Sequence, residues 1–117
     1  MSEAATHISA DIHRVLKDHW GYDRFRSLQE DIITSVLSGQ DTLALLPTGG
    51  GKSICFQVPG LYREGICLVI SPLIALMKDQ VLNLRKRNIA ASAVFSGMSY
   101  REIDITLDNA VYGGANK

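Results

Sequence analysis

The sequence predicts an α/β fold in which a parallel sheet lies between layers of helices. Two observations favour this fold. Short apolar runs alternate along the chain with segments of helical spacing, which implies crossover connections between parallel strands. The two clearest runs, 42–46 and 66–70, are continuously apolar, as expected of strands that are covered on both faces. A length of 117 residues is typical of one small domain.

Three helices are expected in the first half of the chain. Apolar residues recur at helical spacing over 8–16, which predicts the first helix. The second is expected to begin at a capping box formed by Ser27 and Glu30 and to end at Gly39. The third should follow the glycine-rich turn and stop before Pro59, because a proline disfavours helical geometry in the residue before it.

Two more helices and a weaker strand are expected in the second half. Ser71–Pro72 is a favourable helix start, and Asn88 is a plausible C-cap for the same helix. The segment 91–95 is a weak strand candidate. A second capping box, Ser99–Glu102, predicts a final helix toward Tyr112.

The composition restricts the classes of function. Apolar residues make up 46% of the chain and charged residues 21%, as in soluble globular proteins. No apolar run approaches the roughly 18 residues of a membrane helix, and the chain start lacks the pattern of a secretory signal, so we expect no membrane partner and a cytoplasmic location. Cys55 and Cys67 match no metal spacing and are expected to be buried free thiols. Since the formal net charge is zero, any binding of nucleic acid must be local.

The stretch LPTGGGKS, residues 46–53, indicates a phosphate-binding loop. A helix start leaves backbone amides unpaired and carries partial positive charge, so an anion fits there. Glycines let the backbone wrap closely around phosphate oxygens. Lys52 is expected to meet the terminal phosphates as the catalytic cation, and the hydroxyl of Ser53 to ligate Mg²⁺. The predicted nucleotide-binding residues of the loop are Pro47, Thr48, Gly49, Gly50, Gly51, Lys52 and Ser53.

The loop departs from the strict phosphate-loop pattern at one position. That pattern requires glycine five residues before Gly51, where this chain has Leu46. The remaining glycine–lysine–serine pattern arises by chance in a chain of this length on the order of once in a few hundred sequences. The alternative interpretation is a flexible turn with a surface lysine. The apolar run before the turn and the helical segment after it disfavour this alternative.

Three stretches resemble motifs of superfamily-two helicases, and in particular of RecQ-family DNA helicases. LPTGGGKS resembles their phosphate loop, WGYDRFRSLQEDII (20–33) their adenine-reading motif, and LVISPLIALMKDQV (68–81) their motif Ia. Trp20 departs from the phenylalanine often found before Gly-Tyr but keeps an aromatic ring. The resemblance implies an incomplete RecA-like (P-loop) three-layer fold, with residues 1–117 as the N-terminal part of the first helicase lobe. Within it, 1–20 is the leading helix, 21–60 carries the adenine motif and phosphate loop, and 61–117 carries motif Ia and the segment after it.

The resemblance assigns roles to residues near the base and the DNA. Tyr22 is expected to stack on adenine, and Arg26 and Gln29 to hydrogen-bond its edge. Alternatively, Tyr22 packs in the core and Arg26 is a solvated cation; Phe25 is assigned to the core. In motif Ia, the resemblance implies contacts with single-stranded DNA at Ser71, Pro72, Leu73 and Lys78. The alternative is that Leu73 belongs to an apolar core stripe with Leu76 and Met77.

The resemblance also implies partners and cofactors. The chain would use ATP and Mg²⁺ and act on single-stranded or duplex DNA in a bacterial nucleoid, translocating 3′-to-5′. The acidic Asp-Glu-Ala-His motif and the second RecA-like lobe of such enzymes do not occur in this sequence. We therefore expect the isolated chain to be inactive, marginally stable or self-associating, and to need the rest of the helicase as a partner. Two other hypotheses are an RNA helicase of the same superfamily and a stand-alone nucleotide- or DNA-binding module.

Overall fold

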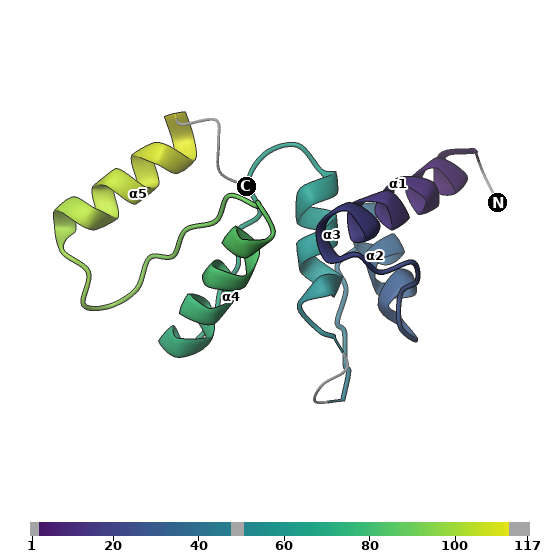
Figure 1. Ribbon diagram of the computed structural model, residues 1–117, viewed down its shortest axis with the longest axis horizontal. Helices are drawn as coiled ribbons and strands as arrows, with labels where there is room; N and C mark the ends of the chain where they lie inside the picture. The colour runs from purple at the N-terminus through teal and green to yellow at the C-terminus, as the bar shows by residue number, and fades with distance from the viewer. Residues whose placement is uncertain (1–2, 48–50, 113–117) are drawn as a thin grey trace. The chain divides into compact units, whose positions relative to one another are not determined.

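The computed structural model describes residues 3–47 and 51–112, and the regular structure in this part of the chain is helical. The helices are α1 (Glu3–Trp20), α2 (Gln29–Leu37), α3 (Ile54–Tyr62), α4 (Ile74–Lys86) and α5 (Tyr100–Tyr112) (Figure 1). The chain divides into two compact units, Met1–Glu64 and Gly65–Lys117. Within the described ranges, no helix is both long enough and apolar enough to span a membrane.

The predicted parallel sheet, and with it the α/β three-layer RecA-like class, is wrong for this structure. The segments 42–46, 66–70 and 91–95 form no strand and are irregular. A strand is stable only when neighbouring strands pair with its backbone and other elements cover its faces. Here Leu43 is 87% exposed and Ile70 is 90% exposed. The two clearest apolar runs therefore have the composition of buried strands but neither the pairing nor the cover.

The first unit is a packed group of three helices. α1, α2 and α3 contact one another (Figure 1), and their shared core consists of Ile12 and Leu16 from α1, Ile33 from α2 and Val58 from α3. Each of these side chains is at most 1% exposed. The helix predicted over 8–16 is confirmed. This core holds α2 and α3 together in one unit. The candidate site described below lies at the starts of these two helices.

Local signals for the ends of α2 and α3 were only partly correct. Gly39 has a φ of 84°, which confirms a left-handed stop after α2. The first capping box is wrong, because Leu28 occupies the N-cap position and no side chain caps the helix there. The predicted stop before Pro59 is also wrong, since α3 continues to Tyr62. The ring of Pro59 is buried, so tertiary packing overrides the local preference.

The second unit contains α4 and α5. α4 begins at Ile74, later than the predicted start at Ser71–Pro72. The C-cap of α4 is Arg87, one residue before the predicted Asn88, and Asn88 is the left-handed residue that follows it, with a φ of 63°. The backbone N–H of Glu102 donates to Ser99 Oγ at 3.1 Å, which confirms the start of α5. No residue of α4 is buried, so the apolar stripe predicted for this helix is not a covered core face.

Candidate nucleotide-binding site

The end of the predicted phosphate loop, residues 51–53, leads directly into α3. Gly51 has a φ of 78°, and Lys52 and Ser53 form the turn before the helix. Ser53 occupies the N-cap position, and its side chain makes no capping hydrogen bond. Its backbone oxygen already accepts from Gln57 N at 2.9 Å. Turn and helix are thus confirmed, whereas the preceding strand is not. Thr48, Gly49 and Gly50, also predicted to bind nucleotide, lie outside the described residues.

The backbone amides at this turn match the requirement for an anion site. Within the described part of the chain, the N–H groups of Lys52 and Ser53 donate to no backbone acceptor. Unpaired amides at a helix start attract anions, because the helix dipole adds partial positive charge there. The side chain of Lys52 is exposed. The turn therefore presents two backbone donors and one ammonium group within three residues of the helix.

Gln29 joins this loop to the predicted base-binding motif. Its Nε2 donates to the backbone oxygen of Gly51 at 3.0 Å, and its Oε1 accepts from Arg26 N at 2.7 Å. The residue is only 1% exposed. A Cβ at position 51 would collide with Gln29 Nε2. Glycine at this position therefore provides two things: a left-handed backbone and room for the amide.

The predicted base-binding residues lie in and just after the turn between α1 and α2. Tyr22 is 51% exposed and Arg26 is also exposed, so their side chains are accessible to a ligand. Phe25 is half-buried and packs against the core of the first unit, as predicted. Leu28 has a φ of 71°, a conformation that is strained for a leucine and must be held by its surroundings.

Lys52 lines a hollow between α2, α3 and the segment 42–46, with a volume of about 260 Å³. The other lining residues are mostly apolar: Ile32, Val36, Thr42, Ala44, Leu46, Cys55 and Phe56. Burial raises the pKa of the Cys55 thiol, and a backbone hydrogen bond partly offsets that effect. Since apolar surface contributes little to phosphate binding, the turn rather than the hollow is the candidate anion site.

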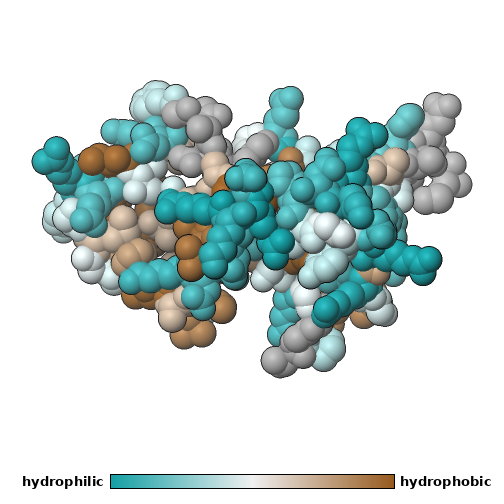
Figure 2. All heavy atoms as spheres, viewed as in Figure 1, coloured by the Kyte–Doolittle hydropathy of each residue, from teal (hydrophilic) through white to brown (hydrophobic). Residues whose placement is uncertain are grey.

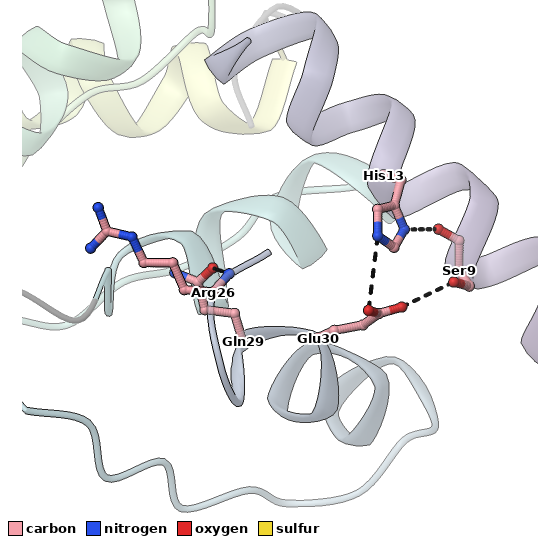
Figure 3. A network of polar contacts seen from close by, with 5 residues as sticks. All are labelled: Ser9, His13, Arg26, Gln29 and Glu30. Atoms are coloured by element: carbon pink, nitrogen blue, oxygen red, sulfur yellow. Dashed lines mark hydrogen bonds and ion pairs between the residues drawn. The ribbon is translucent and has the colours of Figure 1, made fainter. Parts of the chain in front are cut away.

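A second polar cluster links α1 to the start of α2 (Figure 3). Ser9 Oγ donates to Glu30 Oε1 at 3.0 Å, and His13 Nε2 lies 3.8 Å from Glu30 Oε2. The sequence pattern assigned Glu30 to a capping box and gave no role to His13. It missed this cluster because no local pattern pairs residues that lie 21 positions apart.

The residues predicted to contact DNA belong to the second unit. Ser71 Oγ accepts from Leu73 N at 3.3 Å, and Pro72 and Leu73 are exposed. The ammonium of Lys78 lies 4.8 Å from the centre of the Phe95 ring, a cation–π geometry. The predicted contact of Lys78 with DNA therefore competes with an interaction inside this unit.

Comparison with known proteins identifies the family. The family model described as DEAD/DEAH box helicase matches residues 26–112. The chain belongs to the DEAD/DEAH box helicase family. This helicase-family chain is 50% identical over 91 residues to an ATP-dependent DNA helicase RecQ of Synechocystis, covering 78% of the chain and 19% of that protein. It is 46% identical over 110 residues to the RecQ protein of Bacillus subtilis, covering 91% of the chain and 18% of that protein.

A third relative, the RecQ protein of Haemophilus influenzae, is 48% identical over 88 residues, which are 75% of this chain and 14% of that protein. These likenesses confirm the predicted resemblance to RecQ-type helicases. The chain spans less than a fifth of the length of these curated relatives. The family match begins at residue 26, so helix α1 lies outside it.

Proposed function

We propose that this chain supplies part of the ATP-binding site of an ATP-dependent DNA helicase of RecQ type. The observation that carries the proposal is the 3.0 Å hydrogen bond from Gln29 to Gly51. It connects the end of a phosphate loop to the segment proposed to read adenine. A base and a triphosphate bound together need two such regions side by side, and one folded unit contains both.

Each group in the site has a proposed role. The ring of Tyr22 stacks on adenine, and the guanidinium of Arg26 hydrogen-bonds the edge of the base. We propose that Gln29, whose amide bonds the Gly51 oxygen and Arg26 N, also takes part in recognising the base edge. Lys52 binds the terminal phosphates.

Magnesium fits the site through one protein ligand. Mg²⁺ prefers oxygen donors and often keeps several waters and phosphate oxygens in its shell. The Ser53 hydroxyl is such a donor and makes no capping hydrogen bond. No group of three or more metal-ligating side chains occurs among the described residues. Ser53 would therefore hold the ion together with phosphate oxygens and water, and the ion would neutralise phosphate charge.

We propose that Ser71, Pro72, Leu73 and Lys78 contribute to binding of single-stranded DNA. Exposure of Pro72 and Leu73 supports this assignment. We also propose that the isolated chain binds ATP without sustained hydrolysis or unwinding. Phosphoryl transfer needs a positioned water and charge stabilisation in addition to a phosphate cradle, and the assigned residues supply the cradle and one metal ligand.

Nucleotide titration tests the proposal. ATP, GTP and inorganic tripolyphosphate are titrated into the chain with Mg²⁺ present, and heat is recorded by calorimetry. ATP should bind more tightly than the other two ligands. Tyr22→Ala should weaken ATP by about fivefold or more, because base stacking contributes about 1–3 kcal/mol, and should leave tripolyphosphate unchanged. Tyr100→Ala, at another exposed tyrosine, is the matched control. Base recognition is contradicted if ATP and GTP bind with equal affinity, or if Tyr22→Ala and Tyr100→Ala lose ATP affinity to the same extent.

A further inference from the structure

One face of helix α1 lies against the segment that contains the proposed base-binding residues. Ser9, His13 and Lys17 are spaced four residues apart and therefore share a face of the helix. Ser9 Oγ donates to Glu30 Oε1 at 3.0 Å. Lys17 Nζ lies 3.0 Å from Asp23 Oδ1. The contacts thus reach both ends of the segment 22–30, which we call the base segment.

His13 forms the middle of this contact. Its Nδ1 lies 2.7 Å from the backbone oxygen of Ser9. A carbonyl oxygen only accepts, so Nδ1 carries the proton and the ring orientation is fixed. The ring then lies edge-on to Phe25 with 4.9 Å between centroids, and its Nε2 lies 3.8 Å from Glu30 (Figure 3). The His13 ring of α1 therefore contacts both Phe25, in the turn between α1 and α2, and Glu30, at the start of α2.

The residues that α1 contacts alternate with those proposed to bind the base. Asp23 follows Tyr22, Phe25 precedes Arg26, and Glu30 follows Gln29. The same segment contains the strained left-handed Leu28, which keeps its geometry only if its neighbours are held. Fixing these three neighbours restricts the positions of the three base-binding side chains.

We propose that Ser9, His13 and Lys17 are positioning residues that set the affinity for the adenine base. The proposal rests on the proposed function of the same site. The three residues do not contact the nucleotide. They hold the base segment in a binding geometry, so that ATP binding does not have to order it, and preorganisation of this kind raises affinity. The phosphate turn at Lys52 and Ser53 makes none of these contacts. Its link to the base segment is the bond from Gln29 to Gly51, which does not involve Ser9, His13 or Lys17, so phosphate binding should be retained without them.

The core side of α1 is separate from this face. Ile12 and Leu16 anchor the helix and are fully buried, whereas the polar contacts are partly solvent-exposed. Exposed ion pairs and hydrogen bonds add little to folding stability. Removing the polar groups should therefore change nucleotide affinity and leave the helices folded.

The test uses Ser9→Ala and His13→Ala in the full chain. ATP and tripolyphosphate affinities are measured by calorimetry, and helix content by circular dichroism. ATP affinity should fall about threefold to tenfold in each variant, the range expected for loss of one hydrogen bond in Ser9→Ala and of one edge-on ring contact in His13→Ala. Tripolyphosphate affinity and helix content should not change. Ser9→Thr keeps the hydroxyl and should restore ATP affinity. His7→Ala, at an exposed histidine of the same helix, is the matched control.

The outcomes separate this inference from the proposed function. If the unaltered chain discriminates ATP from tripolyphosphate and both variants do so equally well, the positioning role is wrong and the nucleotide site stands. If both ligands lose affinity in proportion to a loss of helix content, the residues are merely structural and the inference also fails. If the unaltered chain binds no nucleotide, the proposed function fails and the inference fails with it.

Discussion

The side-chain amide of Gln29 donates a hydrogen bond to the backbone oxygen of Gly51, a residue 22 positions further along the chain. Since the amide oxygen also accepts from Arg26 N, one buried side chain holds the base segment and the end of the proposed phosphate loop together. Its burial makes this connection sensitive to substitution, because a buried polar partner left unpaired costs about 1–3 kcal/mol.

Gly51→Ala should disrupt both the loop and its connection to Gln29. The added Cβ collides with Gln29 Nε2, and the positive φ of 78° is unfavourable for alanine. We expect the free energy of unfolding to fall by about 1–3 kcal/mol and ATP binding to be lost, as measured by urea unfolding and calorimetry.

Gly39→Ala is the matched control for this substitution. Gly39 has a similar φ of 84°, but a Cβ there meets no atom within 4 Å. The Gly39→Ala variant should lose stability through backbone strain alone and should retain its affinity for ATP. Equal loss of ATP binding in both variants would mean that the contact with Gln29 has no special role.

The core of the first unit should depend on Ile33. This side chain is fully buried at the junction of α1, α2 and α3. Ile33→Ala should lower the free energy of unfolding by about 2–5 kcal/mol, as expected for a large-to-small core substitution, and chemical denaturation followed at 222 nm measures it. Leu43→Ala, at an exposed position, should change stability by less than about 0.5 kcal/mol. If Leu43→Ala lowered the free energy of unfolding more than Ile33→Ala did, the three-helix core would be contradicted.

The exposed apolar runs predict self-association of the isolated chain. Leu43, Leu45, Leu68 and Ile70 are all exposed, and apolar side chains reach the surface in several places (Figure 2). Exposed apolar surface of this kind favours association in the micromolar to millimolar range. Sedimentation velocity should show an average mass that rises with concentration. Replacing Leu43 and Leu45 by lysine should reduce this rise in mass. A monodisperse monomer at every concentration would count against self-association.

Both thiols should react slowly near neutral pH. Burial raises the pKa of Cys55 and of Cys67 above the ordinary thiol value. A raised pKa in the folded state favours folding below the pKa of the unfolded chain, and that contribution is lost as pH rises through the folded-state pKa. The chain should therefore lose stability in the alkaline range. Alkylation by iodoacetamide should be slower in the folded chain than in urea, and equal rates would refute this account.

Helices were predictable from the sequence where their signals are local. The apolar spacing over 8–16, the left-handed stop at Gly39 and the serine cap at Ser99 depend on residues within one or two turns. Pro59 was misjudged because the burial of its ring within α3 depends on packing against other helices. The sheet was misjudged for a related reason. An apolar run shows that a segment can be buried in a sheet, but strand formation needs partners that the run itself does not specify.

The sequence proposes residues for the candidate site but does not reveal how they are connected. Glycine, lysine and serine in the order of residues 51–53 indicate a phosphate loop, because that chemistry depends on adjacent residues. The bond from Gln29 to Gly51 and the bond from Ser9 to Glu30 each join residues more than 20 positions apart. Tertiary packing sets such contacts, and the sequence identified Gln29 without revealing that it also holds the loop.

The central claim is that the turn before α3 binds a nucleoside triphosphate, and titration of ATP–Mg²⁺ into the chain and its Lys52→Ala variant tests it most directly. Loss of a charge-assisted contact should weaken binding about tenfold or more. Lys86→Ala, at an exposed lysine of α4, should bind like the unaltered chain. Saturable ATP binding that Lys52→Ala leaves unchanged would contradict the account.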